Sequence, residues 1–216
     1  MLNLIIEYAP AFLTGILETL AIAIVALIEG LLIGISLTTC SAYSHSMHLI
    51  VRCFSNVIIF LPELFILFLI YFAGTEIISA FLHQTVEINA FMASTFTLAL
   101  VFGCYAYKIF YSNFINMPGG EKEAAKILGL SEKYIWRKIL LPSIFQKSLP
   151  GLGNLWLILL KETSIVSLIG ATELLSRIQF IIVHTQQPFI FYSITAILYF
   201  TLSNLSENGL KRLVKI

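Results

Sequence analysis

The stretch GEKEAAKILGLSEKYIWRKILLP, residues 120–142, is the longest polar run in a chain that is otherwise strongly apolar. Ala124 and Ala125 have high helix propensity and little bulk, so a partner surface could approach them closely. Gly129 can adopt the left-handed conformation that ends a helix, and Ser131 can cap the start of the next one. The stretch predicts two helices joined by a turn in water. A solvated linker that merely joins two membrane spans would have the same helical spacing.

The rest of the chain is too apolar for a soluble protein. Of its 216 residues, 58% are hydrophobic, and the mean hydropathy is +0.92, so most of its surface is expected to face the lipid bilayer. The net charge is only +1 and no basic stripe is interleaved with aromatic residues, which argues against a nucleic-acid partner. The N-terminus lacks the basic region and cleavage site of a signal peptide, so we expect the first span to remain as an anchor.

Apolar runs predict a single domain over residues 1–216 with five transmembrane helices. The expected spans are 11–39, 54–73, 90–111, 150–170 and 189–205, with the polar segment 118–142 between the third and the fourth. If the fourth run spans despite its charges, Arg52, the basic residues of the polar segment and the basic tail lie on one side, and only Arg177 lies on the other. The positive-inside rule then predicts the N-terminus outside and the C-terminus in the cytoplasm of an all-α integral membrane protein.

The first helix carries two acidic residues at membrane depth. Glu18 and Glu29 are eleven positions apart, which brings them to within roughly 20° of each other, on the same stripe as Thr14. Charged groups in the membrane normally face protein or water, so the stripe is expected to point into the bundle, where it could favour a cationic solute. Gly30 and Gly34 form a GxxxG pair that permits close packing of a neighbouring helix.

Polar residues inside the other apolar runs predict a translocation path. Pro62 distorts the second run directly before a carboxylate, which suggests a lined cavity. The path candidates are the polar groups at membrane depth and one aromatic wall: Glu63, Tyr105, Lys161, Glu162 and Thr163. The alternative is that these charges satisfy one another structurally across helices.

The connecting segments are less distinctive. Residues 74–89 are interpreted as a loop, and 171–187 as an amphipathic helix in the outer interface that could form a lid over the path. His45 and His48 have no carboxylate or cysteine at a fitting spacing, so a loop surface is favoured over a metal site. The cysteines have no CxxC or His-paired spacing and are interpreted as small buried residues, not as ligands or disulfides: Cys40, Cys53 and Cys104.

The polar stretch also resembles the EAA signature of ABC importer permeases, in which a short cytoplasmic helix, a turn and a second helix dock into a groove on the ATPase subunit. The matching positions are Glu123, Ala124, Ala125, Gly129, Ile139, Leu141 and Pro142. The segments MPGGEKEAAKILGLS, LPGLGNLWLILLKETSIVSLIG and HTQQPFIFY are similar to permease subunits of bacterial polar amino acid importers, and LPELFILFLIYF looks closest to the arginine branch. This chain has Ile59-Phe60 where the family usually has Arg-Gly before the second-helix proline.

The resemblance implies a type I, MetI-like ABC importer permease fold with a cytoplasmic coupling helix, in the inner membrane of bacteria. Docking to the ATPase would then fall on Glu123, Ala124, Ala125 and Gly129. The implied partners are two ABC ATPase subunits, a second permease subunit that is identical or homologous, and an extracytoplasmic binding protein. That protein would deliver a polar amino acid, with arginine or another basic amino acid as the implied cargo. A scaffold or sensor that docks the ATPase without transporting is the alternative.

The sequence gives no sign of an enzyme. No G-x-x-x-x-G-K-[ST] run occurs, so the chain cannot cradle nucleotide phosphates and transport energy would have to come from a partner. We expect neither a cofactor nor a metal ion in this chain. An intramembrane enzyme would need convergent nucleophile, base or metal ligands at depth, whereas the four histidines fall in predicted connecting segments and the chain has no aspartate.

Overall fold

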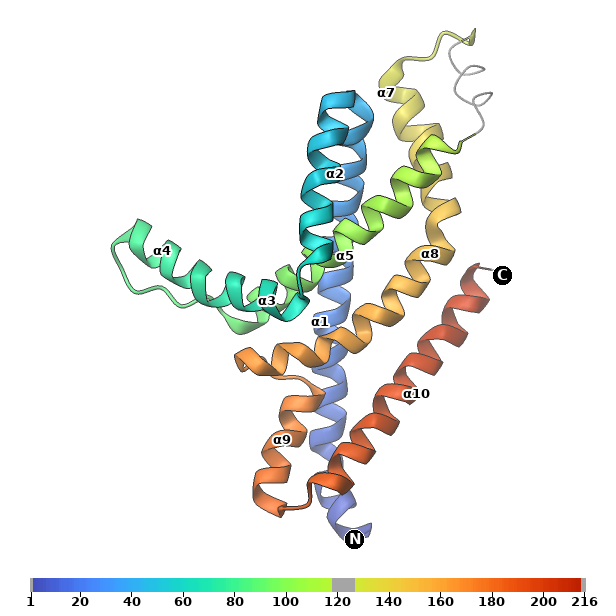
Figure 1. The fold of residues 1–216 in the computed structure, drawn as a ribbon. Helices are drawn as coiled ribbons and strands as arrows, with labels where there is room; N and C mark the ends of the chain where they lie inside the picture. Colours follow the sequence, from blue (N-terminus) through green and yellow to red (C-terminus); the bar gives the residue numbers. More distant parts are fainter. Residues whose placement is uncertain (1, 118–126, 215–216) are drawn as a thin grey trace.

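The computed structural model describes residues 2–117 and 127–214, and within these ranges the secondary structure is entirely helical (Figure 1). Five helical segments are long and apolar enough to cross a membrane: Ile6–Tyr43, Glu63–Leu82, Ala90–Ile115, Glu132–Ile169 and Pro188–Arg212. The expected all-α membrane architecture with five apolar helices is confirmed.

The most extensive packing between two helices in the described structure is that of α1 (Leu2–Tyr43) against α5 (Ala90–Ile115). Glycines on both helices make this contact close. A Cβ atom added to Gly34 would lie 2.9 Å from the Cβ of Ala106, and one added to Gly103 would lie 2.8 Å from the Cβ of Ile33. The GxxxG pair of α1 therefore permits the close packing that the sequence predicts.

A proline divides the second apolar run into two helices. The amphipathic α2 (His45–Phe60) ends at Leu61, which has the extended conformation that a following proline imposes. After Pro62 the chain forms one continuous helical segment that extends sideways from the bundle (Figure 1). It consists of α3 (Glu63–Phe68), the π-helical turn η1 (Leu69–Ala73) and α4 (Gly74–Leu82).

The prediction of a loop over residues 74–89 is wrong for its first half. Gly74 continues the helix with ordinary right-handed geometry, and α4 ends only at His83, which has a left-handed backbone. Because Ile77, Ile78 and Phe81 extend the apolar surface, helix formation outweighs the presence of one glycine and one glutamate.

The fourth span begins within the polar stretch, at Glu132. It consists of α7 (Glu132–Ile135), the π-helical turn η2 (Trp136–Leu140), α8 (Leu141–Glu162) and the 3₁₀ helix η3 (Thr163–Ile169). Gly170 ends this run with a φ angle of +81°. The main hydrophobic core lies where α8 packs against α5 and α1.

A second core joins α9 (Leu174–Thr185) and α10 (Pro188–Val214) to the N-terminal half of α1. Its buried residues are Phe12, Leu174, Ile178, Ile181 and Phe191. The amphipathic helix expected within 171–187 is α9. One face of this helix is buried against α1 and α10, so it is fastened to the bundle.

The cysteine prediction is only partly correct. All three thiols are free, and Cys104 is buried, but Cys40 and Cys53 are exposed. An apolar sequence environment does not imply burial here, because in a membrane protein the outer surface of a helix is apolar as well.

Candidate functional site

Three of the predicted path residues meet in one cavity. Glu63, Tyr105 and Glu162 line a space of about 160 Å³ together with apolar side chains of α5 and α8. They come from three elements: Glu63 lies in the first turn of α3, Tyr105 lies on α5, and Glu162 is the last residue of α8. We call this space the acid cavity.

The two carboxyl groups lie at different places in their helical segments. Glu63 begins a helical segment, where the positive end of the helix dipole favours a negative charge. Glu162 lies inside a continuous run, because α8 is followed directly by η3. The helix break at Pro62 makes Glu63 the first residue of a new helix and places its side chain at the cavity wall.

The side chains of Glu63 and Glu162 both line this small cavity, which brings two carboxyl groups close to each other. Neither carboxyl group forms an ion pair with a Lys or Arg side chain in the part of the chain that the structure describes. The acid cavity therefore holds two acidic groups without an ion-pair partner in the described part of the chain.

The other two path candidates lie outside this cavity. Lys161 is exposed, next to Glu162 in sequence but on a different side of the helix. Thr163 is fully buried, and its hydroxyl donates to the backbone carbonyl of Leu160 at 2.8 Å. The five residues are thus divided between a cavity wall, an exposed surface and a buried helix junction.

A second group of polar residues fastens α9 to the bundle, and we call it the α9 polar cluster: Glu18, Thr19, Glu173, Arg177 and Tyr199. Its centre is the Glu173 side chain, which is 0% exposed. The Glu173 carboxylate accepts hydrogen bonds from the backbone N–H groups of Leu175 and Ser176, both at 2.8 Å, and from the Tyr199 hydroxyl at 2.7 Å. Burial raises the pKa of the Glu173 carboxyl, and these three donors act in the opposite direction.

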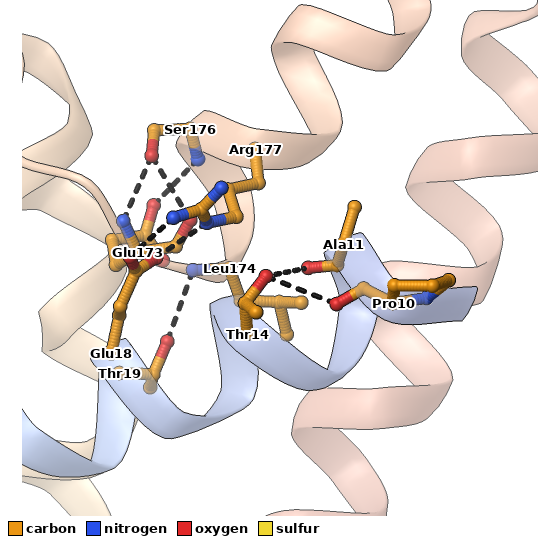
Figure 2. Close-up of polar contacts among 9 residues, drawn as sticks. All are labelled: Pro10, Ala11, Thr14, Glu18, Thr19, Glu173, Leu174, Ser176 and Arg177. Atoms are coloured by element: carbon orange, nitrogen blue, oxygen red, sulfur yellow. Dashed lines mark hydrogen bonds and ion pairs between the residues drawn. The ribbon is translucent and has the colours of Figure 1, made fainter. Parts of the chain in front are cut away.

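The same cluster holds α1 against α9, as Figure 2 shows. Arg177 forms a two-pronged ion pair with Glu18, in which its Nε lies 2.6 Å from Oε2. The backbone N–H of Leu174 donates to the Thr19 hydroxyl at 3.1 Å. Gly15 lets the helices come this close, since a Cβ atom there would lie 2.8 Å from the Cα of Leu174.

The two acidic residues of α1 therefore have different surroundings. Glu18 is neutralised by Arg177, a partner 159 positions away that sequence reasoning did not find. Glu29 is half-buried, and its Oε2 atom has no hydrogen-bond partner among the described residues. The Glu173 and Tyr199 contacts were missed as well. An acidic residue directly before an amphipathic helix, with serine three positions later, was the available signal, because that pattern is typical of a helix cap.

The predicted docking segment is only partly described. Glu123, Ala124 and Ala125 lie outside the described residues. Gly129 has a left-handed φ angle of +71°, with open space where a Cβ atom would lie. The Ser131 hydroxyl accepts a hydrogen bond from the Tyr134 backbone N–H at 3.3 Å and so caps α7. The turn and the helix restart that the sequence predicts are present.

Comparisons with known proteins agree with this architecture. Residues 30–215 match the model of the family described as binding-protein-dependent transport system inner membrane component. The arginine ABC transporter permease protein ArtQ of Haemophilus influenzae is 31% identical over 207 residues, which cover 96% of this chain and 93% of the relative. The histidine/lysine/arginine/ornithine transport system permease protein HisQ of Escherichia coli is 28% identical, over 94% of this chain and 91% of the relative.

Solved structures show the same fold. A chain from a crystal structure of an amino acid ABC transporter with histidines superposes with a TM-score of 0.84 and 28% identity, covering 98% of this chain and 96% of its own. The MetNI methionine ABC transporter in an inward-facing form gives a TM-score of 0.78 at 17% identity, covering 97% of both chains. The chain therefore belongs to the family of binding-protein-dependent transport system inner membrane components, and it is a transmembrane permease subunit of an ABC importer.

Proposed function

We propose that this permease carries a basic amino acid such as arginine, and that the acid cavity is where the cationic part of the cargo binds. The observation that carries the proposal is that Glu63 and Glu162 line one small cavity, at a depth where an acidic group is costly, and that neither has an ion-pair partner among the described residues. A guanidinium or ammonium group would supply the missing positive charge. The similarity to the arginine permease and to the histidine/lysine/arginine/ornithine permease supports the same class of cargo.

Binding of a cation follows from the chemistry of the pair. A guanidinium group has several N–H donors and can donate to both carboxylates, which gives charge-assisted hydrogen bonds with defined geometry. The ring of Tyr105 adds an aromatic wall that favours a cation. The apolar residues of α5 and α8 line the rest of the cavity and remove part of the water around the pair, so the attraction is stronger there than it would be at a fully exposed surface.

We further propose that the acid cavity is completed by a second permease subunit, identical or homologous. Glu63 and Glu162 are only half-buried, and Tyr105 is 37% exposed. Partly exposed carboxyl groups at membrane depth are costly against lipid, so they need protein or water on their open side. A subunit that faces them across a water-filled path would provide both.

The proposed complex spans the bacterial inner membrane with the N-terminus outside. Basic residues gather at the connection between α5 and α7 and near the C-terminus, which the positive-inside rule assigns to the cytoplasm. Two ATPase subunits would bind there, on the segment containing Glu123, Ala124, Ala125 and Gly129, and an amino acid binding protein would dock on the opposite side. Closure of the ATPase dimer would then move the attached helices and expose the path alternately to each side.

Uptake by the reconstituted complex tests the acid cavity. The permease, its ATPase and its binding protein are placed in proteoliposomes with ATP inside, and uptake of radiolabelled L-arginine is measured for Glu162→Gln and Glu63→Gln. We expect each variant to lose at least tenfold in uptake, because one charge-assisted contact with the cargo is removed in a partly desolvated site. Glu87→Gln, which changes an exposed glutamate outside the cavity, is the control. Normal arginine uptake by Glu162→Gln would refute the proposal.

The docking segment is tested separately by Gly129→Asp. We expect this variant to abolish ATP-driven uptake, because the new carboxylate lies on the surface that the ATPase would contact, while the membrane helices stay folded. Gly170→Asp is the matched control, since Gly170 has the same left-handed backbone as Gly129 and the same open space where a Cβ atom would lie. Full uptake by Gly129→Asp would count against coupling through this segment.

A further inference from the structure

A second cavity, of about 380 Å³, lies between α2 and α5 and has no role in the proposal above. Its walls carry the cationic side chains of Arg52 and Lys108, and we call it the basic pocket. Lys108 and Ser112 of this pocket follow Tyr105 of the acid cavity at spacings of three and seven residues, so all three lie on one face of α5. The basic pocket therefore continues the face of the acid cavity along the same helix.

The inner wall of the basic pocket is held in place by a chain of contacts across three helices. The Ser41 hydroxyl of α1 donates to the Tyr107 hydroxyl of α5 at 3.0 Å, and that hydroxyl lies 3.3 Å from Nδ1 of His48 on α2. The His48 ring also stacks on Tyr111, with 4.3 Å between ring centroids and 12° between planes. These contacts hold the aromatic side chains that line the pocket together with Lys108 and Arg52.

The cations of the pocket are free to bind an anion. Arg52 and Lys108 are both exposed, and neither forms an ion pair with a carboxylate within residues 2–117 and 127–214. Among the described residues that line the pocket, none is acidic. A guanidinium fork and an ammonium group on facing helices are the donors that bind an oxyanion well. The acid cavity and the basic pocket thus offer opposite charges on consecutive parts of one face.

We propose that the basic pocket is an oxyanion subsite of the translocation path, which binds the carboxylate of the amino acid cargo as it moves toward the cytoplasm. This inference rests on the proposed function, because it takes the acid cavity as the preceding station. Three residues of α5 separate Tyr105 from Lys108, a rise of about 4.5 Å. The carboxylate can therefore reach the pocket while the cationic side chain is still leaving the acid cavity. A second binding site of moderate affinity lowers the energy barrier that the cargo must cross to leave the acid cavity.

The test compares arginine binding with arginine uptake in the complete transporter. Radiolabelled L-arginine is used for equilibrium binding to the detergent-purified complex and for ATP-driven uptake into phosphatidylcholine vesicles, with or without phosphatidylglycerol. We expect Lys108→Gln and Arg52→Gln each to lower the maximal uptake rate at least fivefold in both kinds of vesicle, with arginine binding unchanged. Lys108→Glu should lose more, and Lys108→Arg should restore most of the rate. Lys147→Gln, which removes an exposed lysine of α8 outside the pocket, is the control and should transport normally.

Uptake at the wild-type rate by both Lys108→Gln and Arg52→Gln would overturn the inference. A defect that occurs only in vesicles containing phosphatidylglycerol would overturn it too, because the anion bound would then be a lipid headgroup. The proposed function fails in a different way, namely when Glu162→Gln binds and takes up arginine normally in the same assays. Arg52 lies on α2 and Lys108 lies on α5, so misfolding of one helix would not explain the same defect in both variants.

Discussion

The acid cavity and the α9 polar cluster both place glutamates inside a membrane protein, yet they treat the charge in opposite ways. In the α9 polar cluster, Glu173 is fully buried and accepts three hydrogen bonds, and Glu18 is paired with Arg177. In the acid cavity, Glu63 and Glu162 are less buried and have no ion-pair partner among the described residues. Burial alone does not distinguish a structural carboxyl group from one that is available to a ligand. The number of hydrogen-bond donors and cations that the protein places around the carboxyl group does distinguish them.

This difference explains why the two groups lie where they do. The α9 polar cluster sits where α1, α9 and α10 pack together, so its satisfied carboxylates join elements that are far apart in sequence. The acid cavity sits at helix ends created by Pro62 and by the change from α8 to η3, where the packing leaves space. A site for a solute needs both that space and an unmet charge.

The largest expected effect on stability is that of Glu173→Ala. Removing this carboxylate leaves two backbone N–H groups and the Tyr199 hydroxyl without their acceptor in a buried place. We expect the free energy of unfolding to fall by about 3 kcal/mol, as for the loss of a buried hydrogen-bond network. Thermal unfolding of the purified protein in detergent measures it. An unchanged melting temperature would show that the α9 polar cluster is not structural.

Tyr199→Phe should have an intermediate effect. It removes one donor to Glu173 and nothing of the ring packing, so we expect a loss of about 1 to 2 kcal/mol in the same unfolding measurement. Tyr192→Phe, on the same helix at a more exposed position, is the matched control and should be close to neutral. Equal shifts for the two variants would mean that the hydroxyl contact contributes nothing.

The Glu18–Arg177 pair should give the smallest effect. Its side chains are 29% and 36% exposed, so solvent screens the interaction. A double-mutant cycle with Glu18→Gln and Arg177→Gln should give a coupling energy of about 0.5 to 1 kcal/mol, decreasing with added salt. A coupling energy of zero at low salt would leave α9 held by the Glu173 network and by apolar packing alone.

The sequence predicted the membrane class, the five apolar helices, the family and three residues of the acid cavity, because these rest on local signals. Hydropathy reports the solvent of each segment, and Pro62 beside Glu63 or a carboxylate inside an apolar run can be read without knowing the fold. The left-handed Gly129 and the Ser131 cap are local in the same sense.

The remaining features depend on contacts between distant segments. Arg177 and Glu18 are 159 positions apart, and no pattern in one helix identifies its partner in another. The burial of Thr163 and the exposure of Lys161 depend on how η3 packs, which periodicity does not fix. The sequence signal for α4 is weak, because Gly74 and Glu76 at its start are more typical of a loop than the apolar residues that follow them.

One pair of matched substitutions tests the central claim most directly. Glu162→Gln and Glu173→Gln each replace one acid by its amide, and both are compared with the wild type by thermal unfolding of the purified complex in detergent. We predict that Glu162→Gln leaves the melting temperature unchanged or raises it while arginine uptake is lost, because the acid cavity holds surplus negative charge. We predict that Glu173→Gln lowers the melting temperature, because an amide cannot accept from all three donors without turning its own N–H groups toward one of them. Destabilisation of equal size by both substitutions would contradict the distinction between a cargo site and a structural cluster.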